Sequence, residues 1–439
     1  MKRTTSLGQL AWAGVGGCLA TFSAHAEVIA DSHANLSLRN FYFNSDNRDG
    51  TAAPSKTEEW AQGFLLDFRS GYTEGTVGAG VDIMAMMGLT LDSGTGRHSG
   101  STMIPSDGSQ AADQWSNMGA TAKFKLSQSE LRIGQLMPKM PVLLASDGRL
   151  LPQTFQGAQI QSKDVKDFTL IAGALNRAKG RASTDLTGMA VSGGTQESDR
   201  FYFAGADYRA TEALMLQYYV GQLQDYYTQQ FVGLTHSFPL TEMSSLSTDV
   251  RYFRTRSEGA NASASGRSLG YTVAGYTQDG DGEIDNDLWS AAFTYRLGGH
   301  AVTLGLQSVS DDSNFVQLNQ GSIDKGAGGS SLYLWTDKML LSFTRAGEQT
   351  RFAQYAYDFA ANGIPGLKAS LIYLKGDSIQ TTGGQKQEEW ERDFSLDYVV
   401  QGGTFKGLGI AWRNAESHSE AARNGDQNRV ILNYTLPLF

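Results

Sequence analysis

The 439-residue chain carries 36 basic and 45 acidic side chains, a formal net charge of −9. This acidic balance argues against nucleic acid as a partner, because binding to phosphates requires clustered positive charge. The chain is rich in Gly (51), Tyr (18) and Phe (21) but holds only 8 Pro, which is typical of strands and turns. No Pro-rich, Ser-rich or charged linker divides it, so one large all-β unit is predicted.

The N-terminus has the pattern of a secretory signal peptide. Lys2 and Arg3 precede an apolar segment, residues 7–22, and a small-residue cleavage site at 24–26. We therefore expect a signal peptide over residues 1–26 and a mature protein over residues 27–439. A retained membrane anchor needs about 20 apolar residues and is the less favoured alternative.

Cys18 is the only cysteine and lies in the expected signal peptide. A lipoprotein cleaved before Cys18 is a minor alternative, because the preceding Val-Gly-Gly matches that signal poorly. We expect the mature chain to form no disulfide and to have no thiolate metal ligand.

Apolar and polar residues alternate with a period of two along the whole mature chain, as in strands with two different faces. The alternating segments are residues 35–39, 75–83, 121–125, 130–135, 168–172, 201–206, 214–220, 231–235, 246–253, 288–295, 302–307, 351–359, 368–375, 394–401, 408–413 and 430–438. With their flanks they approach the roughly ten residues of a tilted transmembrane strand. A simple count gives up to about twenty strands, and barrels of this kind use even numbers. The uncertain pair lies in residues 330–346, which could instead belong to a long loop over 311–349.

The connections between these segments alternate in length. Short turns are residues 73–75, 127–129, 209–212, 298–299, 361–366 and 402–406, and long polar stretches are residues 44–59, 92–115, 177–199, 256–285, 376–391 and 414–428. Short turns on one side and long loops on the other indicate an outer-membrane β-barrel with extracellular long loops. Aromatic residues cluster at strand ends, as at 41–43 and 201–203, and the chain ends on Phe439, which fits an interfacial girdle.

A soluble β-sandwich is the competing fold, since its strands alternate as well. Its inward face should be apolar, yet here the polar face carries mid-strand charges such as Lys123, Asp249 and Asp397. Charges inside a closed sheet need water around them, which favours a wide barrel with a wet lumen.

One stretch, residues 136–157 (LMPKMPVLLASDGRLLPQTFQG), breaks the strand pattern. Pro138, Pro141 and Pro152 each remove a ladder donor, yet the stretch is too apolar for a solvated loop. A long, stiff, apolar loop is predicted to fold against protein. Inside a barrel it would brace across the lumen and make Lys139 and Arg149 candidates for the narrowest point.

Four mid-strand arginines have the parity of the lumen face, each beside small or polar neighbours and opposite apolar ones; they are Arg39, Arg132, Arg251 and Arg413. Arginine stays charged and offers a fork of donors that matches a carboxylate. A spaced series of arginines therefore predicts a path along which an anion steps between shallow sites.

Two further arginines are weaker candidates for this path. Arg181 lies just beyond the strand that follows the apolar loop. Arg392 has the parity of Phe394 and Leu396 and could lie above the membrane. Taken singly, any of these arginines can be a rim charge or a structural ion pair, and the convergence of four on one face is what favours a channel.

Several short sequences across the mature chain resemble those of a known family. They are LRN at 38–40, EWAQGF at 59–64, LRIG at 131–134, PKMPV at 138–142, RLLPQTFQG at 149–157, IDN at 284–286, YDF at 357–359, GIPGL at 363–367 and YVVQGG at 398–403. On these sequences the chain resembles outer-membrane porins of the OprD type from pseudomonad bacteria. The resemblance implies an 18-stranded antiparallel barrel in the bacterial outer membrane. It also implies that residues 136–157 form an inward-folded third extracellular loop and residues 311–349 a seventh loop that dips inward.

The resemblance also implies a function. Such porins pass small carboxylate-bearing nutrients along a ladder of basic residues, by passive diffusion and without enzymatic chemistry or a cofactor. DSHA at 31–34 and IPGL at 364–367 resemble the branch that favours cyclic or aromatic carboxylates. Porins for basic amino acids or dipeptides are the near alternative, and a non-transporting structural or adhesive barrel is another. Relatives often carry basic residues where this chain has Gln354, Ile372 and Ala411, which implies a thinner ladder.

The expected partners are small carboxylate substrates, outer-membrane lipid and lipopolysaccharide, and the barrel-assembly machinery through Phe439. A monomer or weak trimer is expected. No metal is expected, because the acidic run at 279–287 resembles a calcium loop but has Ser290 where a Glu is needed.

Overall fold

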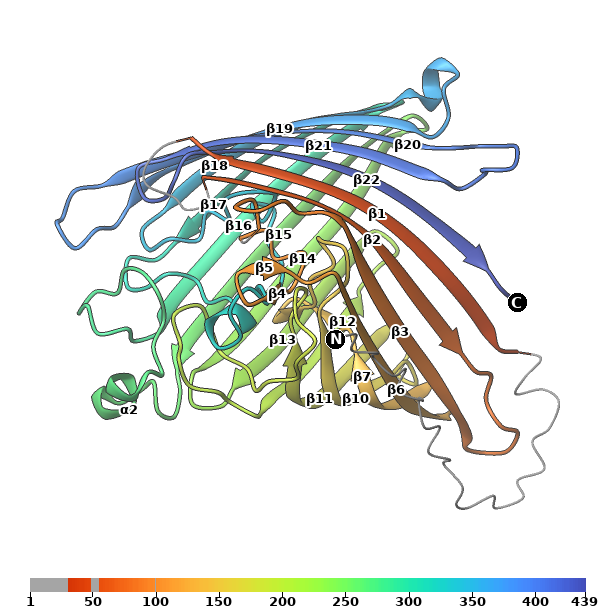
Figure 1. Cartoon of the computed structure of the whole chain (residues 1–439), viewed down its shortest axis with the longest axis horizontal. Helices are drawn as coiled ribbons and strands as arrows, with labels where there is room; N and C mark the ends of the chain where they lie inside the picture. The colour runs from red at the N-terminus through yellow and green to blue at the C-terminus, as the bar shows by residue number, and fades with distance from the viewer. Residues whose placement is uncertain (1–30, 49–54, 99) are drawn as a thin grey trace, which may run out of the picture.

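Eighteen antiparallel strands close into one barrel in the computed structural model, which describes residues 31–48, 55–98 and 100–439 (Figure 1). The barrel strands are β1 (His33–Asn47), β2 (Lys56–Arg69), β3 (Gly78–Asp92), β6 (Gln114–Leu126), β7 (Ser129–Leu136), β10 (Thr154–Ser162), β11 (Phe168–Lys179), β12 (Phe201–Arg209), β13 (Leu214–Leu223), β14 (Tyr227–Thr241), β15 (Ser244–Ser257), β16 (Asp285–Leu297), β17 (His300–Val309), β18 (Gln349–Asp358), β19 (Leu367–Ile379), β20 (Gln387–Val399), β21 (Gly409–Ser419) and β22 (Gly425–Pro437). Each pairs with its neighbours in chain order, and β1 pairs with β22 to close the barrel. The expected signal peptide lies outside the described residues.

Few other elements are present among the described residues. Two small hairpins are β4 (Ser106–Asp107) with β5 (Gln110–Ala111), and β8 (Lys139–Met140) with β9 (Leu143–Leu144). The helices are α2 (Ala264–Leu269), η1 (Gln320–Ser322) and η2 (Phe359–Asn362). In the part of the chain that the structure describes, no helix is long and apolar enough to cross a membrane.

The two faces of the strands differ as the alternation predicts. Large apolar side chains such as Val232, Phe293 and Leu304 lie exposed on the outside of the barrel. Polar side chains such as Ser290 and Thr303 alternate with them and are buried inside. An exposed apolar belt is favourable only against lipid tails, and a closed barrel leaves no unpaired strand edge there.

Each predicted strand segment overlaps an observed strand, but two observed strands were not predicted. β2 was missed because its first four residues lie in the predicted polar stretch 44–59, and β10 because its start lies in the proline-rich stretch. The uncertain residues 330–346 contain no strand, which reduces the simple count of about twenty to the eighteen observed.

Three of the predicted long polar loops are largely wrong, namely 44–59, 376–391 and 414–428. β1 continues to Asn47, β19 to Ile379 and β21 to Ser419 before the chain turns back. The strands of these hairpins have 11 to 15 residues, whereas about 9–11 suffice to cross the bilayer. Polar strand ends that rise above the lipid therefore look like loop in the sequence.

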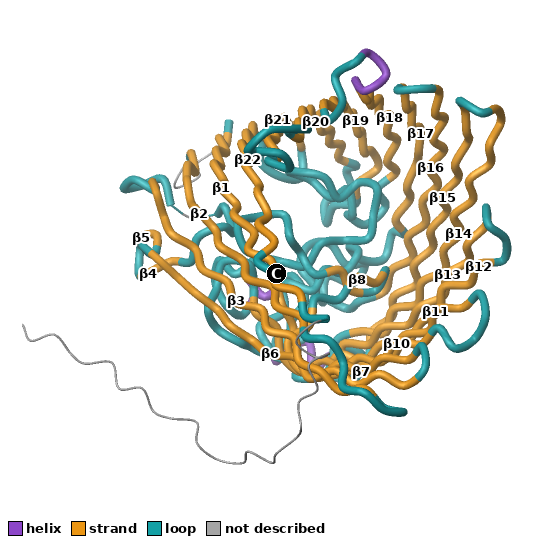
Figure 2. Tube along the Cα trace, turned by 90° about the vertical axis from the view of Figure 1, so that its right-hand side faces the viewer, coloured by secondary structure: helices purple, strands orange, loops and turns teal. Residues whose placement is uncertain are grey.

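Two long loops fold into the lumen (Figure 2). We call residues 137–153 loop 3 and residues 310–348 loop 7. Loop 3 is shorter than the predicted stretch, because Leu136 ends β7 and residues 154–157 begin β10. A backbone bridge joins Leu144 to Ser331, and the Ser330 hydroxyl donates to Gln153 Oε1 at 3.0 Å, so the two loops are bonded to each other.

The apolar residues of loop 3 pack against the inside of the barrel wall. Met140, Val142 and Leu143 share one buried cluster with Phe201, Phe231 and Phe253 of the wall and with Phe315, Leu318 and Leu334 of loop 7. Burial of these side chains stabilises the inward position of both loops by the hydrophobic effect. The predicted packing of the apolar loop against protein is thus observed. Loop 3 packs against the barrel wall on one side and against loop 7 on the other.

Candidate functional site

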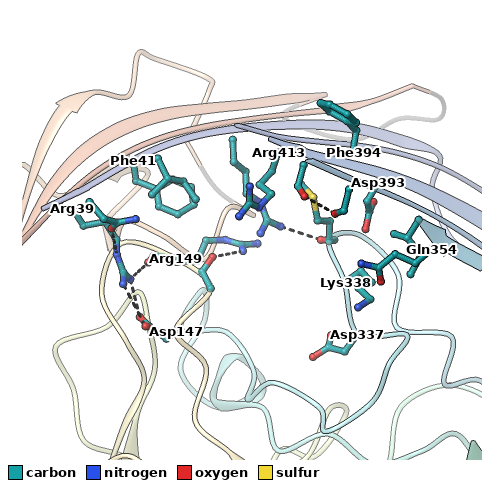
Figure 3. A pocket seen from close by; sticks show the side chains of 18 residues that line it. Arg39, Phe41, Asp147, Arg149, Asp337, Lys338, Gln354, Asp393, Phe394 and Arg413 are labelled. Carbon is teal, nitrogen blue, oxygen red and sulfur yellow. Dashed lines mark hydrogen bonds and ion pairs between the residues drawn. The ribbon is translucent and has the colours of Figure 1, made fainter. Parts of the chain in front are cut away.

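A cavity of about 400 Å³ lies between loop 3, loop 7 and the wall formed by β1 and β18 to β22 (Figure 3). Its lining residues are Arg39, Phe41, Asp147, Gly148, Arg149, Asp337, Lys338, Met339, Gln354, Ser370, Ile372, Asp393, Phe394, Ser395, Arg413, Arg429, Ile431 and Asn433. Predicted Arg39, Arg149 and Arg413 therefore meet at one place, although they come from a strand at each end of the chain and from a loop.

Arg39 of β1 is held tightly by loop 3. Its Nη1 lies 2.7 Å from Asp147 Oδ1 and donates to Arg149 O at 2.7 Å, while Nε donates to Asn433 Oδ1 at 3.1 Å. A guanidinium group with its donors already used in this way is an anchor for the loop as well as a charge at its edge.

Arg149 comes from loop 3 and projects into the cavity (Figure 3). Its Nε donates to Ser101 O at 2.7 Å, and its guanidinium lies 5.0 Å from the ring centre of Phe43. Burial, reinforced by the nearby charges of Arg429 and Arg181, lowers the pKa of Arg149 well below its usual value. Burial and two neighbouring arginines thus disfavour the charged form of Arg149, and Glu59 and Asp337 offset this only in part.

Arg181 and Arg429 complete a group of three. Arg181, which follows β11, donates to Ser146 Oγ at 2.9 Å, and burial lowers its pKa to about 10. Arg429 of β22 donates to Gln427 Oε1 at 2.6 Å and to Met339 O at 3.1 Å. Across the described residues, Arg149, Arg181 and Arg429 hydrogen-bond to neutral groups and none of them forms an ion pair. We call these three residues the arginine cluster.

The acidic side of the cavity is formed mainly by loop 7 and β20. Asp337 and Lys338 lie at its far end (Figure 3). Burial raises the pKa of Asp337 above its usual value and lowers that of Lys338. Asp393 of β20 is also buried, and its Oδ1 has no hydrogen-bond partner within the described part of the chain.

The other predicted basic residues lie elsewhere. Arg413 lies at the cavity but is paired with Asp397 at 2.5 Å. Arg251 of β15 is chelated by Asp249 and stacks on Tyr333 of loop 7. Arg132 and Lys139 line a second lumen cavity of about 280 Å³, which they share with Asp82. Lys139 and Arg149 therefore face different cavities, at opposite ends of loop 3.

Arg392 does not line the lumen. Its side chain donates to Asn414 and Glu416 of β21, on the face that also presents Trp412 to the outside. The parity shared with Phe394 already indicated this direction, and the placement of Arg392 in the substrate path is corrected on this ground.

Outside the predicted loop 136–157, four charged residues that line the cavity were missed in the sequence, namely Arg429, Asp393, Asp337 and Lys338. Arg429 has lumen parity but precedes the predicted strand 430–438 by one residue, and Asp393 precedes the predicted strand 394–401 in the same way. Extension of the alternation by one residue would have found both. Asp337 and Lys338 carry no local signal, because loop 7 owes its path to contacts with the wall.

The comparisons with known proteins agree with the 18-stranded barrel fold. The model of the OprD family, described as outer membrane porin, matches residues 26–438. The porin-like protein GalP of Pseudomonas putida is 34% identical over 415 residues, which cover 93% of each chain. Among solved structures, Pseudomonas aeruginosa OccK8 (OprE) superposes with a TM-score of 0.87 at 46% identity, over 94% of this chain and 100% of that one. Pseudomonas aeruginosa OpdK, solved with vanillate, has a TM-score of 0.80 at 34% identity, over 93% of this chain and 100% of that one.

Proposed function

The chain belongs to the OprD family of outer-membrane porins, and on that premise we propose that it selects small carboxylates with an aromatic or cyclic body. As a member of this family it is a substrate-specific passive channel of the bacterial outer membrane and not an enzyme. The proposal concerns the substrate class and the residues that select it.

The observation that carries the proposal is the arginine cluster. Arg149 and Arg429 line the cavity, and Arg181 lies behind them, bonded to Ser146 of loop 3. None of the three has a carboxylate partner among the described residues, and the charges of Arg181 and Arg429 disfavour that of Arg149. A passing carboxylate would supply the missing negative charge and accept forked, charge-assisted hydrogen bonds. Because Arg39 and Arg413 already have carboxylate partners, we assign the selecting role to Arg149, Arg181 and Arg429.

The apolar part of the cavity supports an aromatic or cyclic body. Met339, Ile372 and Ile431 line it beside the arginines, and the uncharged Gln354 lies on the same wall. Such a wall accepts a ring more readily than a second charged group, because apolar surface is best covered by apolar surface. The vanillate in the OpdK structure, an aromatic carboxylate, supports the same class.

The proposal is tested with Arg149→Gln in liposomes that contain the purified channel. We expect uptake of benzoate to fall by about tenfold, because one charge-assisted hydrogen bond is worth about 1.5–3 kcal/mol. Uptake of arabinose, a neutral sugar of similar size, should change little. Arg392→Gln, on the outside of the barrel, is the matched control and should leave both rates unchanged.

The same assay separates the alternatives. An equal loss of benzoate and arabinose uptake would mean that Arg149 only shapes loop 3. Faster uptake of lysine than of benzoate by the unmodified channel would overturn the proposal in favour of basic amino acids, for which Asp147, Asp337 and Asp393 would be the attractive groups.

A further inference from the structure

Two side chains of the barrel wall hold the part of loop 7 that borders the cavity. At its start, Arg251 of β15 donates Nη1 to Tyr333 O at 2.9 Å, and its guanidinium lies 4.1 Å from the centre of the Tyr333 ring. At its end, Glu391 of β20 accepts hydrogen bonds from the backbone N–H groups of residues 339–341. Residues 333–341 therefore follow the inner face of the wall from β15 to β20, with both ends fixed.

The contact at Glu391 is unusual in its chemistry. The carboxylate is fully buried, and its Oε1 accepts from Met339 N at 3.1 Å and from Leu340 N at 3.0 Å, while Oε2 accepts from Leu341 N. Successive backbone N–H groups form a concavity that binds an anion, and a buried carboxylate is tolerated only when such donors satisfy it. Here the concavity belongs to a loop and the accepting carboxyl oxygens belong to a strand, so these hydrogen bonds fix the loop to the wall.

The position of this contact links it to the cavity. Asp337 and Lys338, which line the cavity, immediately precede the bonded residues. Arg429 of the arginine cluster donates to the carbonyl of Met339, on the same turn of the loop. A shift of residues 339–341 would therefore move an acid, a base and one arginine of the cavity together.

We propose that Glu391 is a positioning residue that sets the aperture of the channel by holding loop 7 against β20. It is buried and does not line the cavity, so it acts on the passing solute only through Asp337, Lys338 and Arg429. The proposal rests on the proposed function in one respect, namely that this cavity is the selecting point. The current recordings that test it use potassium chloride and no carboxylate solute. A failure of this proposal can therefore be distinguished from a failure of the carboxylate proposal.

The experiment is single-channel recording of Glu391→Gln and Glu391→Ala in potassium chloride. We expect both variants to show frequent current transitions and a mean open conductance that differs from the unmodified value by about twofold in Glu391→Ala. Glu391→Gln keeps one acceptor oxygen and should be intermediate. Glu388→Gln is the matched control, because Glu388 lies on the same strand but is exposed and paired with Lys375; its current should match the unmodified channel.

A second measurement follows the position of the loop directly. The expected mature chain has no cysteine, so a Lys338→Cys reporter can be labelled with a charged thiol reagent from the lumen. We expect Glu391→Gln to change the labelling rate of this reporter several-fold, and Glu388→Gln to leave it unchanged. Folding of each variant is checked by the slower migration of the boiled protein in gel electrophoresis. Quiet currents and an unchanged labelling rate in a folded Glu391→Gln channel would overturn the proposal.

Discussion

At the scale of single residues, the basic side chains of the lumen fall into two classes. Arg39 forms an ion pair with Asp147, and Arg251 forms one with Asp249. Both arginines also donate hydrogen bonds to backbone carbonyls of the loops. The arginine cluster, by contrast, hydrogen-bonds to neutral groups among the described residues. Substitution in the first class should loosen a loop, whereas substitution in the second should lower the attraction for an anion.

Asp337 gives the cavity a dependence on pH. Burial raises its pKa, with Arg181 and Lys338 as the charged groups that partly oppose this rise. As the pH falls from neutral, Asp337 therefore takes up a proton above the usual range of an aspartate, near 3.9. The cavity then loses a negative charge, and its attraction for anions increases.

We expect benzenesulfonate, which stays ionised throughout, to block the channel at a concentration about two- to tenfold lower at pH 5 than at pH 7.5. The measurement is the half-blocking concentration in single-channel recordings. In the Asp337→Asn channel, benzenesulfonate should block at both pH values at the low concentration expected for the unmodified channel at pH 5, because the asparagine side chain is always neutral. If Asp337→Asn keeps the pH dependence of the unmodified channel, another group is responsible.

Parity predicts the site residues that strands carry, whereas Arg149 was predicted from the apolar, proline-rich stretch that contains it. Parity alone places Arg39, Arg251 and Arg413 on the lumen face and indicates an outward Arg392, because side-chain direction in a strand follows from position. Parity cannot predict that Arg251 contacts Tyr333, because that contact depends on the path of loop 7. The roles of Asp337 and Glu391 depend on the hydrogen bond between Met339, two residues after Asp337, and Glu391. These two segments lie about fifty residues apart in the sequence.

At the scale of elements, a strand pair supports loop 7 from below. Gly305 of β17 faces Phe352 of β18, and a Cβ at Gly305 would lie 2.2 Å from the Phe352 ring. The ring lies over the glycine and stacks on Trp335 of loop 7, with 6.3 Å between ring centres. The absence of a side chain at Gly305 thus leaves room for the Phe352 ring, against which Trp335 of loop 7 packs.

Gly305→Ala should destabilise the folded barrel by about 1–3 kcal/mol, the usual cost of an extra methyl group in a packed core. The measurement is the urea concentration or temperature at which the compact band in gel electrophoresis is lost. Gly402→Ala is the control, because Gly402 has open space around its Cβ position, and it should unfold with the unmodified protein. Equal stability of both variants would mean that Phe352 moves aside without cost.

The elements themselves were predictable to the extent that they meet lipid. Alternation in the bilayer is strict because one face is covered by hydrocarbon, and sixteen of the eighteen strands show it. β2 was not predicted, because its polar first half, from Lys56, rises above the lipid, where alternation is not required. β10 escaped because the prolines before it, in loop 3, dominate the local pattern.

At the scale of the whole molecule, the lumen is narrowed by two loops that act as one body. A barrel of this strand number otherwise encloses a wide aqueous channel. Loops 3 and 7 are joined by the bridge between Leu144 and Ser331 and by the bond from Ser330 to Gln153. Their apolar residues share one buried cluster with the wall, so neither loop can leave the lumen without exposing that cluster to water.

This arrangement predicts a sharp upper limit on the size of solutes. The cavity beside Arg149 and Arg429, of about 400 Å³, has room for a single-ring solute with some water. We expect liposomes that contain the channel to swell in arabinose but not measurably in the trisaccharide raffinose, because the joined loops cannot open independently. Removing the side-chain part of the link with Ser330→Ala and Gln153→Ala together should raise the raffinose rate while the barrel stays folded. Entry of raffinose at the rate of arabinose into liposomes with the unmodified channel would show that the loops move aside in the membrane, and the selecting cavity would then have to be sought elsewhere in the lumen.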